Sequence, residues 1–204
     1  MIGVVDYRAG NAPSVMYALA RLGLDAQLVA DANALATVDH LILPGVGAAR
    51  ATLDSLNESG LVEPMRACVL DDRIPFLGIC IGLQVLFEHS EEGRVDCLGW
   101  LQGAVQRFPE TQRVPQIGWN EVRLVRDHPV TADLPAGAHC YFVNSYFAVP
   151  TDPGDVLGVT EYGVEFCSIA GRRNVIATQF HAEKSGELGL GILRCFAAWD
   201  GTGC

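Results

Sequence analysis

The 204-residue sequence is short of positive charge. It has 14 lysine and arginine residues against 24 aspartate and glutamate residues, which gives a formal net charge of -10. Proteins that bind nucleic acid through its phosphate backbone present a basic face. The composition therefore argues against a general nucleic-acid binder. It leaves room for one local basic patch that would bind a phosphorylated substrate or an acidic protein surface.

Closely spaced cysteine pairs and long apolar runs are also missing. The seven cysteines are widely spaced and odd in number, so neither a disulfide framework nor a structural zinc site is expected. No histidine pair has a convincing metal-ligand spacing. No stretch approaches the ~20 apolar residues that span a bilayer, and residues 1–6 do not resemble a signal peptide. We therefore expect a cytoplasmic protein without a membrane segment, a metal or a cofactor.

The first 90 residues alternate between short apolar runs and amphipathic segments. Strands are predicted over 2–5, 26–29, 40–43 and 74–79. Helices are predicted from an N-cap at Asn11 to Gly23, and over 48–56, 61–70 and 81–88. This alternation is typical of a mostly parallel sheet that is covered by helices on both faces.

The second half of the chain has a different pattern. Strand-like segments dominate it, and they are predicted over 121–125, 138–149, 156–160, 166–170 and 175–179. We expect them to form an antiparallel extension or a mixed edge of the sheet. An amphipathic helix over 186–199 closes the chain. No linker or repeat is visible, so residues 1–204 are expected to form one domain.

The most informative local motif is Gly78-Ile79-Cys80-Ile81-Gly82. It follows a predicted strand, precedes a predicted helix and has the form of a nucleophile elbow, in which glycines let the chain turn sharply around the central residue. A helix beginning after Cys80 would favour its thiolate form, and the N–H of Ile81 would face a developing oxyanion. The alternative is a cysteine that is simply packed between two glycines.

A second motif, Gln179-Phe180-His181-Ala182-Glu183, lies at the end of the last predicted strand. Residues two apart on a strand share a face, so His181 and Glu183 could act together. His181 would be the general base, and Glu183 would orient the other nitrogen of its ring. The alternative is a surface histidine beside a surface glutamate. The chain order of nucleophile, histidine and acid favours the triad.

A third motif is Leu43-Pro44-Gly45-Val46-Gly47, which also follows a predicted strand. Its two glycines let backbone N–H groups approach a ligand, so Gly45, Val46 and Gly47 are candidates for a second oxyanion donor. Without Cys80 nearby, the same segment would be interpreted as an ordinary turn.

Together these motifs resemble the class I (triad) glutamine amidotransferases. Within that family, the resemblance is to the glutaminase subunits of imidazole glycerol phosphate synthase, and it spans nearly the whole chain. It is carried by the nucleophile motif 78–84, the His/Glu motif 180–183 and five further segments, which are 6–11, 43–47, 114–120, 141–146 and 179–186.

The resemblance implies a fold, a reaction and a partner. The fold would be flavodoxin-like α/β, with a mostly parallel central sheet, flanking helices and an antiparallel extension. Cys80 would attack the side-chain amide of glutamine with His181 and Glu183 as its triad partners. Gln84, Ser145 and Tyr146 match positions that hold glutamine. The loop at 45–47 matches the family's oxyanion loop, which is thought to rearrange before it donates a hydrogen bond.

The partner implied is a cyclase subunit built as a (βα)8 barrel, with which the chain would form a heterodimer. Ammonia would pass to the barrel and cleave a phosphoribulosyl-formimino intermediate into imidazole glycerol phosphate and an aminoimidazole carboxamide ribotide. Trp119 and Tyr141 match family positions at or near this contact. Core packing is the alternative for both, although Trp119 precedes Asn120 in a segment that reads as an exposed loop.

Three places depart from the family pattern. Arg8 and Ala9 stand where a glycine and an apolar residue are usual, Asn144 replaces a histidine, and Ala182 replaces a proline. Asn144 can still form hydrogen bonds but does not titrate near neutral pH. Ala182 leaves the turn between His181 and Glu183 less rigid than proline would.

Two other functions fit the same sequence. One is a different cysteine hydrolase with the same elbow, against which Gln84 and the Ser145-Tyr146 pair argue. The other is a non-catalytic module that regulates a partner, which would have no need of a complete set of Cys80, His181 and Glu183.

Overall fold

The computed structural model describes residues 1–8 and 11–203. Its central sheet begins with five parallel strands in the order β2-β1-β3-β4-β13 and continues through β12-β10-β7-β5-β6. The parallel strands are β1 (Ile2–Val5), β2 (Ala26–Val29), β3 (His40–Leu43), β4 (Phe76–Ile79) and β13 (Val175–Thr178). This arrangement confirms the predicted fold class, a mostly parallel sheet with an antiparallel extension.

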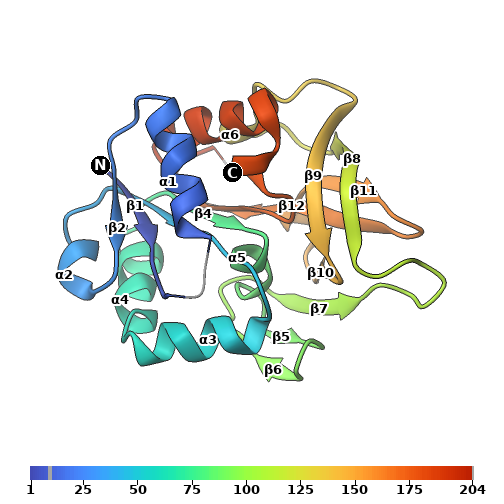
Figure 1. Cartoon of the computed structure of the whole chain (residues 1–204), viewed down its shortest axis with the longest axis horizontal. Helices are drawn as coiled ribbons and strands as arrows, with labels where there is room; N and C mark the ends of the chain where they lie inside the picture. The colour runs from blue at the N-terminus through green and yellow to red at the C-terminus, as the bar shows by residue number, and fades with distance from the viewer. Residues whose placement is uncertain (9–10, 204) are drawn as a thin grey trace.

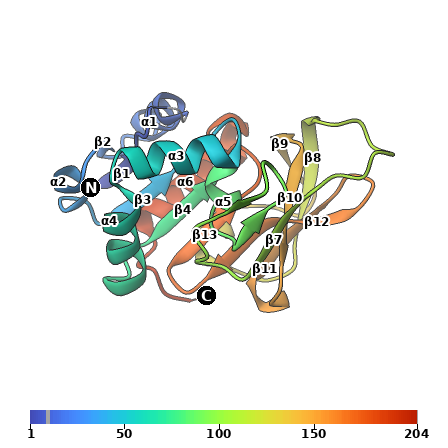
Figure 2. The same ribbon diagram turned by 90° about the horizontal axis from the view of Figure 1, so that it is seen from below.

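Helices cover both faces of the parallel strands (Figures 1 and 2). One face carries α1 (Ala12–Arg21) and α6 (Gly186–Ala198), and the other carries α3 (Ala49–Glu58) and α4 (Val62–Arg66). Successive side chains of a strand point to opposite faces, so Val4 belongs to the first core and Val5 to the second. Both faces are therefore apolar, which explains why these strands are continuous hydrophobic runs.

The antiparallel half is built from longer strands. They are β7 (Gly103–Arg107), β8 (Gln116–Leu124), β9 (Ala138–Asn144), β10 (Tyr146–Pro150), β11 (Val156–Glu161) and β12 (Glu165–Arg172). β8 and β9 pair with each other, and β8 joins the main sheet through β11. The β8–β9 pair stands beside the parallel half and faces the end of α6 (Figure 1).

The helix predicted over 81–88 is wrong in its length, because α5 covers only Ile81–Gln84. Beyond it, the carbonyls of residues 85–87 accept hydrogen bonds from the backbone of residues 98–101 instead of continuing the helix. The chain then forms the short strands β5 (His89–Ser90) and β6 (Val95–Asp96). These two strands, β7 and the short helix α2 (Ala32–Leu35) are absent from the predicted elements.

The strand predicted over 138–149 is also wrong, since it is two strands that separate at Ser145. β9 pairs with β8, whereas β10 pairs with β7 and β12 in the main sheet. The chain changes sheets at Ser145, and this break places Ser145 beside the site described below. Trp119 lies within β8 and not in a loop, because β8 begins earlier than predicted.

No helix within the described ranges is long and apolar enough to cross a membrane.

Candidate active site

Cys80 occupies a strained turn between β4 and α5. Its φ of 57° and ψ of -106° lie in a region that residues with side chains rarely adopt. Its N–H donates to the carbonyl of Thr178 at 2.8 Å. A Cβ on Gly78 would lie 2.5 Å from the Gly82 carbonyl oxygen, and one on Gly82 would lie 2.0 Å from that of Leu43. The glycines are therefore needed for close backbone packing, which forms the predicted elbow.

A pocket of about 260 Å³ opens over Cys80. It lies where the parallel half meets the strand change at Ser145, so loops from both halves of the sheet enclose it. Most of the predicted site residues line it together. The lining residues are Val46, Gly47, Cys80, Ile81, Gln84, Glu92, Pro115, Val143, Asn144, Ser145, Tyr146 and His181.

His181 and Glu183 form a buried pair beside this pocket. The Nδ1 atom of His181 lies 2.9 Å from Oε1 of Glu183, and the side chains are 3% and 1% exposed. The His181 N–H donates to the carbonyl of Tyr141 at 2.9 Å, which anchors the segment to β9. Burial by itself lowers the pKa of His181. Hydrogen bonds and charge interactions with Cys80 and Glu183 outweigh burial and raise this pKa to about 10.

This geometry defines what the three side chains can do chemically. With Nδ1 directed at Glu183, the other ring nitrogen of His181 is available to the thiol of Cys80. The imidazole is therefore placed to take the thiol proton, and the raised pKa means that it holds that proton well. A surface His–Glu pair, the alternative left open by the sequence, does not fit side chains that are this deeply buried.

Gln84 lies at the floor of the pocket and is 2% exposed. Its Nε2 donates to the carbonyl of Tyr146 and to Oε1 of Gln179, both at 3.0 Å. Its Oε1 is buried and has no partner among the described residues. This free acceptor is suited to an N–H group of a bound ligand.

Asn144 supports the strand change at Ser145. Its Nδ2 donates to the carbonyl of Tyr146 at 3.0 Å, which is the same oxygen that Gln84 contacts. Asn144 therefore stabilises this strand change through a hydrogen bond, which its side chain can form although it does not titrate near neutral pH. Ser145 and Tyr146 both reach the pocket.

The two candidate oxyanion segments come together at the pocket. Val46 and Gly47 are exposed and line it, while Gly45 is buried beneath them. A Cβ on Gly45 would lie 2.8 Å from that of Ile81, so the loop and the elbow are in close contact. Within the described part of the chain, the Ile81 N–H has no hydrogen-bond acceptor and remains available to an oxyanion.

Sequence reasoning missed three residues around the site. Glu92 lines the pocket, and its Oε2 accepts the N–H of Ala49 at 2.8 Å. Gln179 places its Nε2 3.8 Å from the Cys80 sulfur. Asn11 donates to Glu183. Gln179 and Asn11 fall inside motifs that were noted, but the sequence contains no signal for Glu92, which reaches the pocket through the unpredicted β5–β6 turn.

Trp119 and Tyr141 form a pair on the outer face of the β8–β9 layer. They are cross-strand neighbours, their ring centroids are 5.8 Å apart, and Trp119 is 53% exposed. Core packing therefore does not account for Trp119. Ile117 and Val143 are also exposed on these strands, and the carbonyl of Val143 lies 3.9 Å from the Cys80 sulfur.

The structure shows the surroundings of two residues that depart from the family pattern, Arg8 and Ala182. Arg8 has a φ of 66°, in the left-handed region that glycine adopts without strain. Ala182 is fully buried at the start of a 3-10 turn (Ala182–Lys184), and its N–H makes no hydrogen bond within the described ranges. Ala9 lies outside the described residues.

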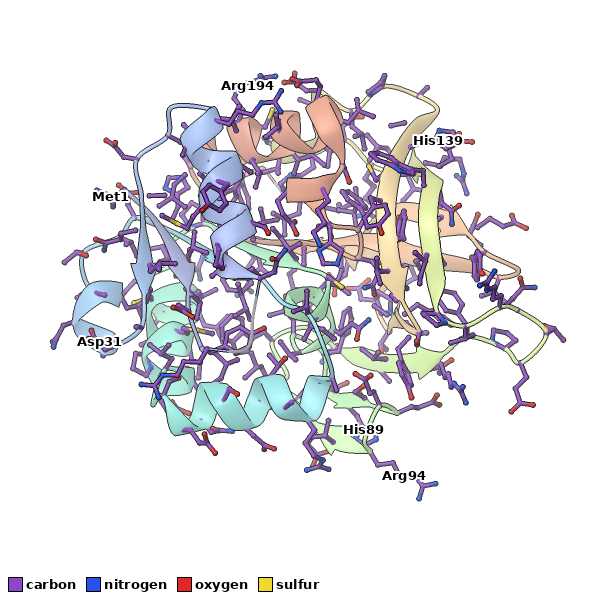
Figure 3. All side chains as sticks on the ribbon, in the orientation of Figure 1. Met1, Asp31, His89, Arg94, His139 and Arg194 are labelled. Carbon is purple, nitrogen blue, oxygen red and sulfur yellow. The ribbon has the colours of Figure 1, made fainter. Side chains whose placement is uncertain are left out.

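No group of three or more His, Cys, Asp and Glu side chains suited to a metal ion is found in residues 1–8 and 11–203. The histidines outside the site are dispersed. Figure 3 shows His89 beside Arg94 near the β5–β6 turn, far from His139 on β9.

The comparisons with known proteins agree on one family. The model of the glutamine amidotransferase class-I family matches residues 3–197. Three proteins named imidazole glycerol phosphate synthase subunit HisH are similar. The protein from Dehalococcoides mccartyi is 44% identical and covers 96% of both chains. The one from Geobacillus thermodenitrificans is 46% identical over 95% of this chain and 93% of its own. The one from a Synechococcus strain is 47% identical over 96% of this chain and 92% of its own.

Two solved structures share the fold. A glutamine amidotransferase crystal structure has a TM-score of 0.76 and 21% identity, and the match covers 97% of this chain and 99% of that one. The PurLQS structure from Thermotoga maritima has a TM-score of 0.75 and 19% identity over 96% of both chains.

Proposed function

This chain belongs to the class-I glutamine amidotransferase family, and we propose that it is the glutaminase subunit of an imidazole glycerol phosphate synthase, acting in the biosynthesis of L-histidine. The observation that carries the reaction is the placement of Cys80 and His181 at one pocket, with Glu183 bound to His181 and both acid–base side chains almost completely buried. The reaction is the hydrolysis of L-glutamine to glutamate and ammonia.

In the proposed mechanism, His181 takes the proton of Cys80, and the sulfur attacks the side-chain carbonyl carbon of glutamine. The oxygen that becomes negative is stabilised by the Ile81 N–H and by an N–H of the 45–47 loop. His181 then gives its proton to the leaving nitrogen, and ammonia departs as the carbonyl re-forms in a glutamyl thioester. Water, with His181 as the base, hydrolyses the thioester and restores the thiol. Glu183 stabilises the imidazolium in both steps.

Recognition of glutamine is assigned to the polar groups at the same pocket. The unpartnered Oε1 of Gln84 suits an N–H of the substrate, and Ser145 and Tyr146 line the wall beside it. Glu92 adds a carboxylate, which suits the α-ammonium group. An ester or an amide without that amino-acid end would leave these polar groups unsatisfied.

The partner proposed is the cyclase subunit, a (βα)8 barrel that forms a heterodimer with this chain. The pair of the exposed Trp119 and the half-buried Tyr141 is its proposed contact, because aromatic side chains are enriched at protein interfaces. The backbone of Tyr141 is hydrogen-bonded to that of His181. A partner that contacts Tyr141 would therefore be separated from His181 by a single backbone hydrogen bond. The proposed location is the cytoplasm, where thiols stay reduced.

Glutamate formation tests this function. We expect slow hydrolysis of glutamine by the chain alone and a large increase with the cyclase and its nucleotide ligand. Cys80→Ser should abolish the activity in both states, whereas Cys195→Ser, a cysteine on α6 away from the pocket, should leave it unchanged. Inactivity in both states would contradict the proposal. High activity without a partner would point to a free-standing hydrolase.

A further inference from the structure

The carboxylate of Glu183 receives two hydrogen bonds on the same oxygen. Oε1 accepts from Nδ1 of His181 at 2.9 Å and from Nδ2 of Asn11 at 2.8 Å. The other oxygen, Oε2, is buried and has no partner among the described residues. No arginine or lysine in those ranges forms an ion pair with this carboxylate. Asn11 is therefore the second side chain, after His181, that holds the Glu183 carboxylate.

The amide of Asn11 is itself oriented by a neighbour. The hydroxyl of Ser14 donates to Oδ1 of Asn11 at 2.7 Å, which turns the NH2 group towards Glu183. An asparagine before a helix usually uses its side-chain oxygen to accept a backbone N–H of the first turn. Asn11 precedes α1 but makes no such cap. Its side chain is committed to Glu183, which lies 172 positions away in the sequence.

We propose that Asn11 is a positioning residue of the triad, which fixes the Glu183 carboxylate and through it the ring of His181 opposite Cys80. This inference rests on the proposed function, because it assigns a role in the same acid–base chemistry. A carboxylate held by the imidazole alone can turn about its terminal bond, and the ring would turn with it. A second donor on the same oxygen fixes the carboxylate plane, and general-base catalysis depends on that orientation.

The first test measures glutamine hydrolysis by the complex with the cyclase and its nucleotide ligand. Asn11→Ala should lower kcat about 10- to 100-fold, the factor expected for losing a hydrogen bond to a charged group. The KM for glutamine should change little, because Asn11 does not line the pocket. Ser14→Ala removes only the hydrogen bond that orients the Asn11 amide, so it should lower kcat by a smaller factor. The matched control is Tyr17→Ala on the same helix, 78% exposed, which should have no effect.

A double-mutant cycle separates positioning from a general structural role. If Asn11 acts through Glu183, Asn11→Ala should cost less than about twofold in a Glu183→Ala background, which has no side-chain oxygen for Asn11 to hold. An equal loss in both backgrounds would overturn the inference. If Asn11→Ala fails to fold, Ser14→Ala takes its place in the same cycle. An effect of Ser14→Ala on kcat that persists undiminished in the Glu183→Ala background would then overturn the inference.

A third measurement does not depend on glutaminase activity. The rate of Cys80 alkylation by iodoacetamide, followed by mass spectrometry at one fixed pH, reports on removal of the thiol proton beside His181. Asn11→Ala should lower this rate, while Tyr17→Ala should not. A wild-type chain that is inactive with its partner, yet is alkylated more slowly once Asn11 is replaced, would refute the proposed function and retain the positioning role. An unchanged alkylation rate in Asn11→Ala would refute the positioning role alone.

Discussion

The turn that carries Cys80 and the segment that carries His181 and Glu183 meet at one pocket, but different contacts hold them in place. The turn is fixed by backbone packed against backbone, with room only for hydrogen at Gly78 and Gly82. The second segment is fixed by single hydrogen bonds to distant residues, Asn11 on Glu183 and the Tyr141 carbonyl on His181. Substitutions in the turn should therefore have all-or-none effects on folding and activity, whereas substitutions in the second segment should lower activity by degrees.

The largest effect is expected for Gly82→Ala. Its Cβ would lie 2.0 Å from the carbonyl oxygen of Leu43, which belongs to a central strand and has little room to move. We expect a loss of at least about 3 kcal/mol in the free energy of unfolding, together with loss of activity. Denaturation in urea measures the free energy of unfolding. Gly191→Ala in α6, where the nearest neighbour is at 3.4 Å, is the control and should be neutral or stabilising. A well-folded, active Gly82→Ala would refute the backbone-contact account of the elbow.

Glu183→Gln should leave the fold intact but lower kcat on the order of 100-fold. The amide retains the shape of the side chain but not the charge that stabilises the His181 imidazolium. The His181 pKa should fall, since Glu183 is one of the groups that raise it. Glutaminase assays and NMR titration of the ring measure the two effects. An unchanged His181 pKa would show that Cys80 alone sets it.

The stability of the protein should depend on pH through His181. Its pKa is raised from 6.5 to about 10 in the folded state. A raised pKa contributes stability that is fully present below the unfolded-state pKa and is lost as pH rises through the folded-state pKa. The difference in unfolding free energy between wild type and His181→Asn should therefore shrink as pH rises. Urea denaturation at about pH 6.5, 8 and 9.5 measures it. A constant difference would contradict the raised pKa.

The smallest effect is expected for Ala182→Pro. Ala182 opens a 3-10 turn and its N–H is not hydrogen-bonded within the described ranges, and His181 before it has an extended backbone at φ -82° and ψ 99°. Proline should fit and raise the free energy of unfolding by about 0.4–1 kcal/mol through the unfolded state. Activity should be retained. A large loss of kcat would mean that the turn must move during catalysis.

Much of the fold follows from local pattern. The buried strands of the parallel half and the helices over 49–58 and 186–198 lie close to their predicted positions, because a strand covered on both faces must be a continuous apolar run. The errors lie where long-range pairing overrides local pattern. The helix after Cys80 ends early because residues 98–101 take its carbonyls, and the strand at 138–149 divides because its two parts pair with different partners.

By itself, the sequence predicted a nucleophile, a histidine and an acid, since a glycine-flanked cysteine after a buried strand and a His-x-Glu at the end of another are local patterns. Only the tertiary structure decided how those groups are held. The donor on Glu183, the carboxylate of Glu92 at the pocket and the exposure of Trp119 all depend on segments that are distant in the chain. Hydrogen bonds and burial at such distances are set by how the strands pair and the helices pack, and no short stretch of residues specifies them.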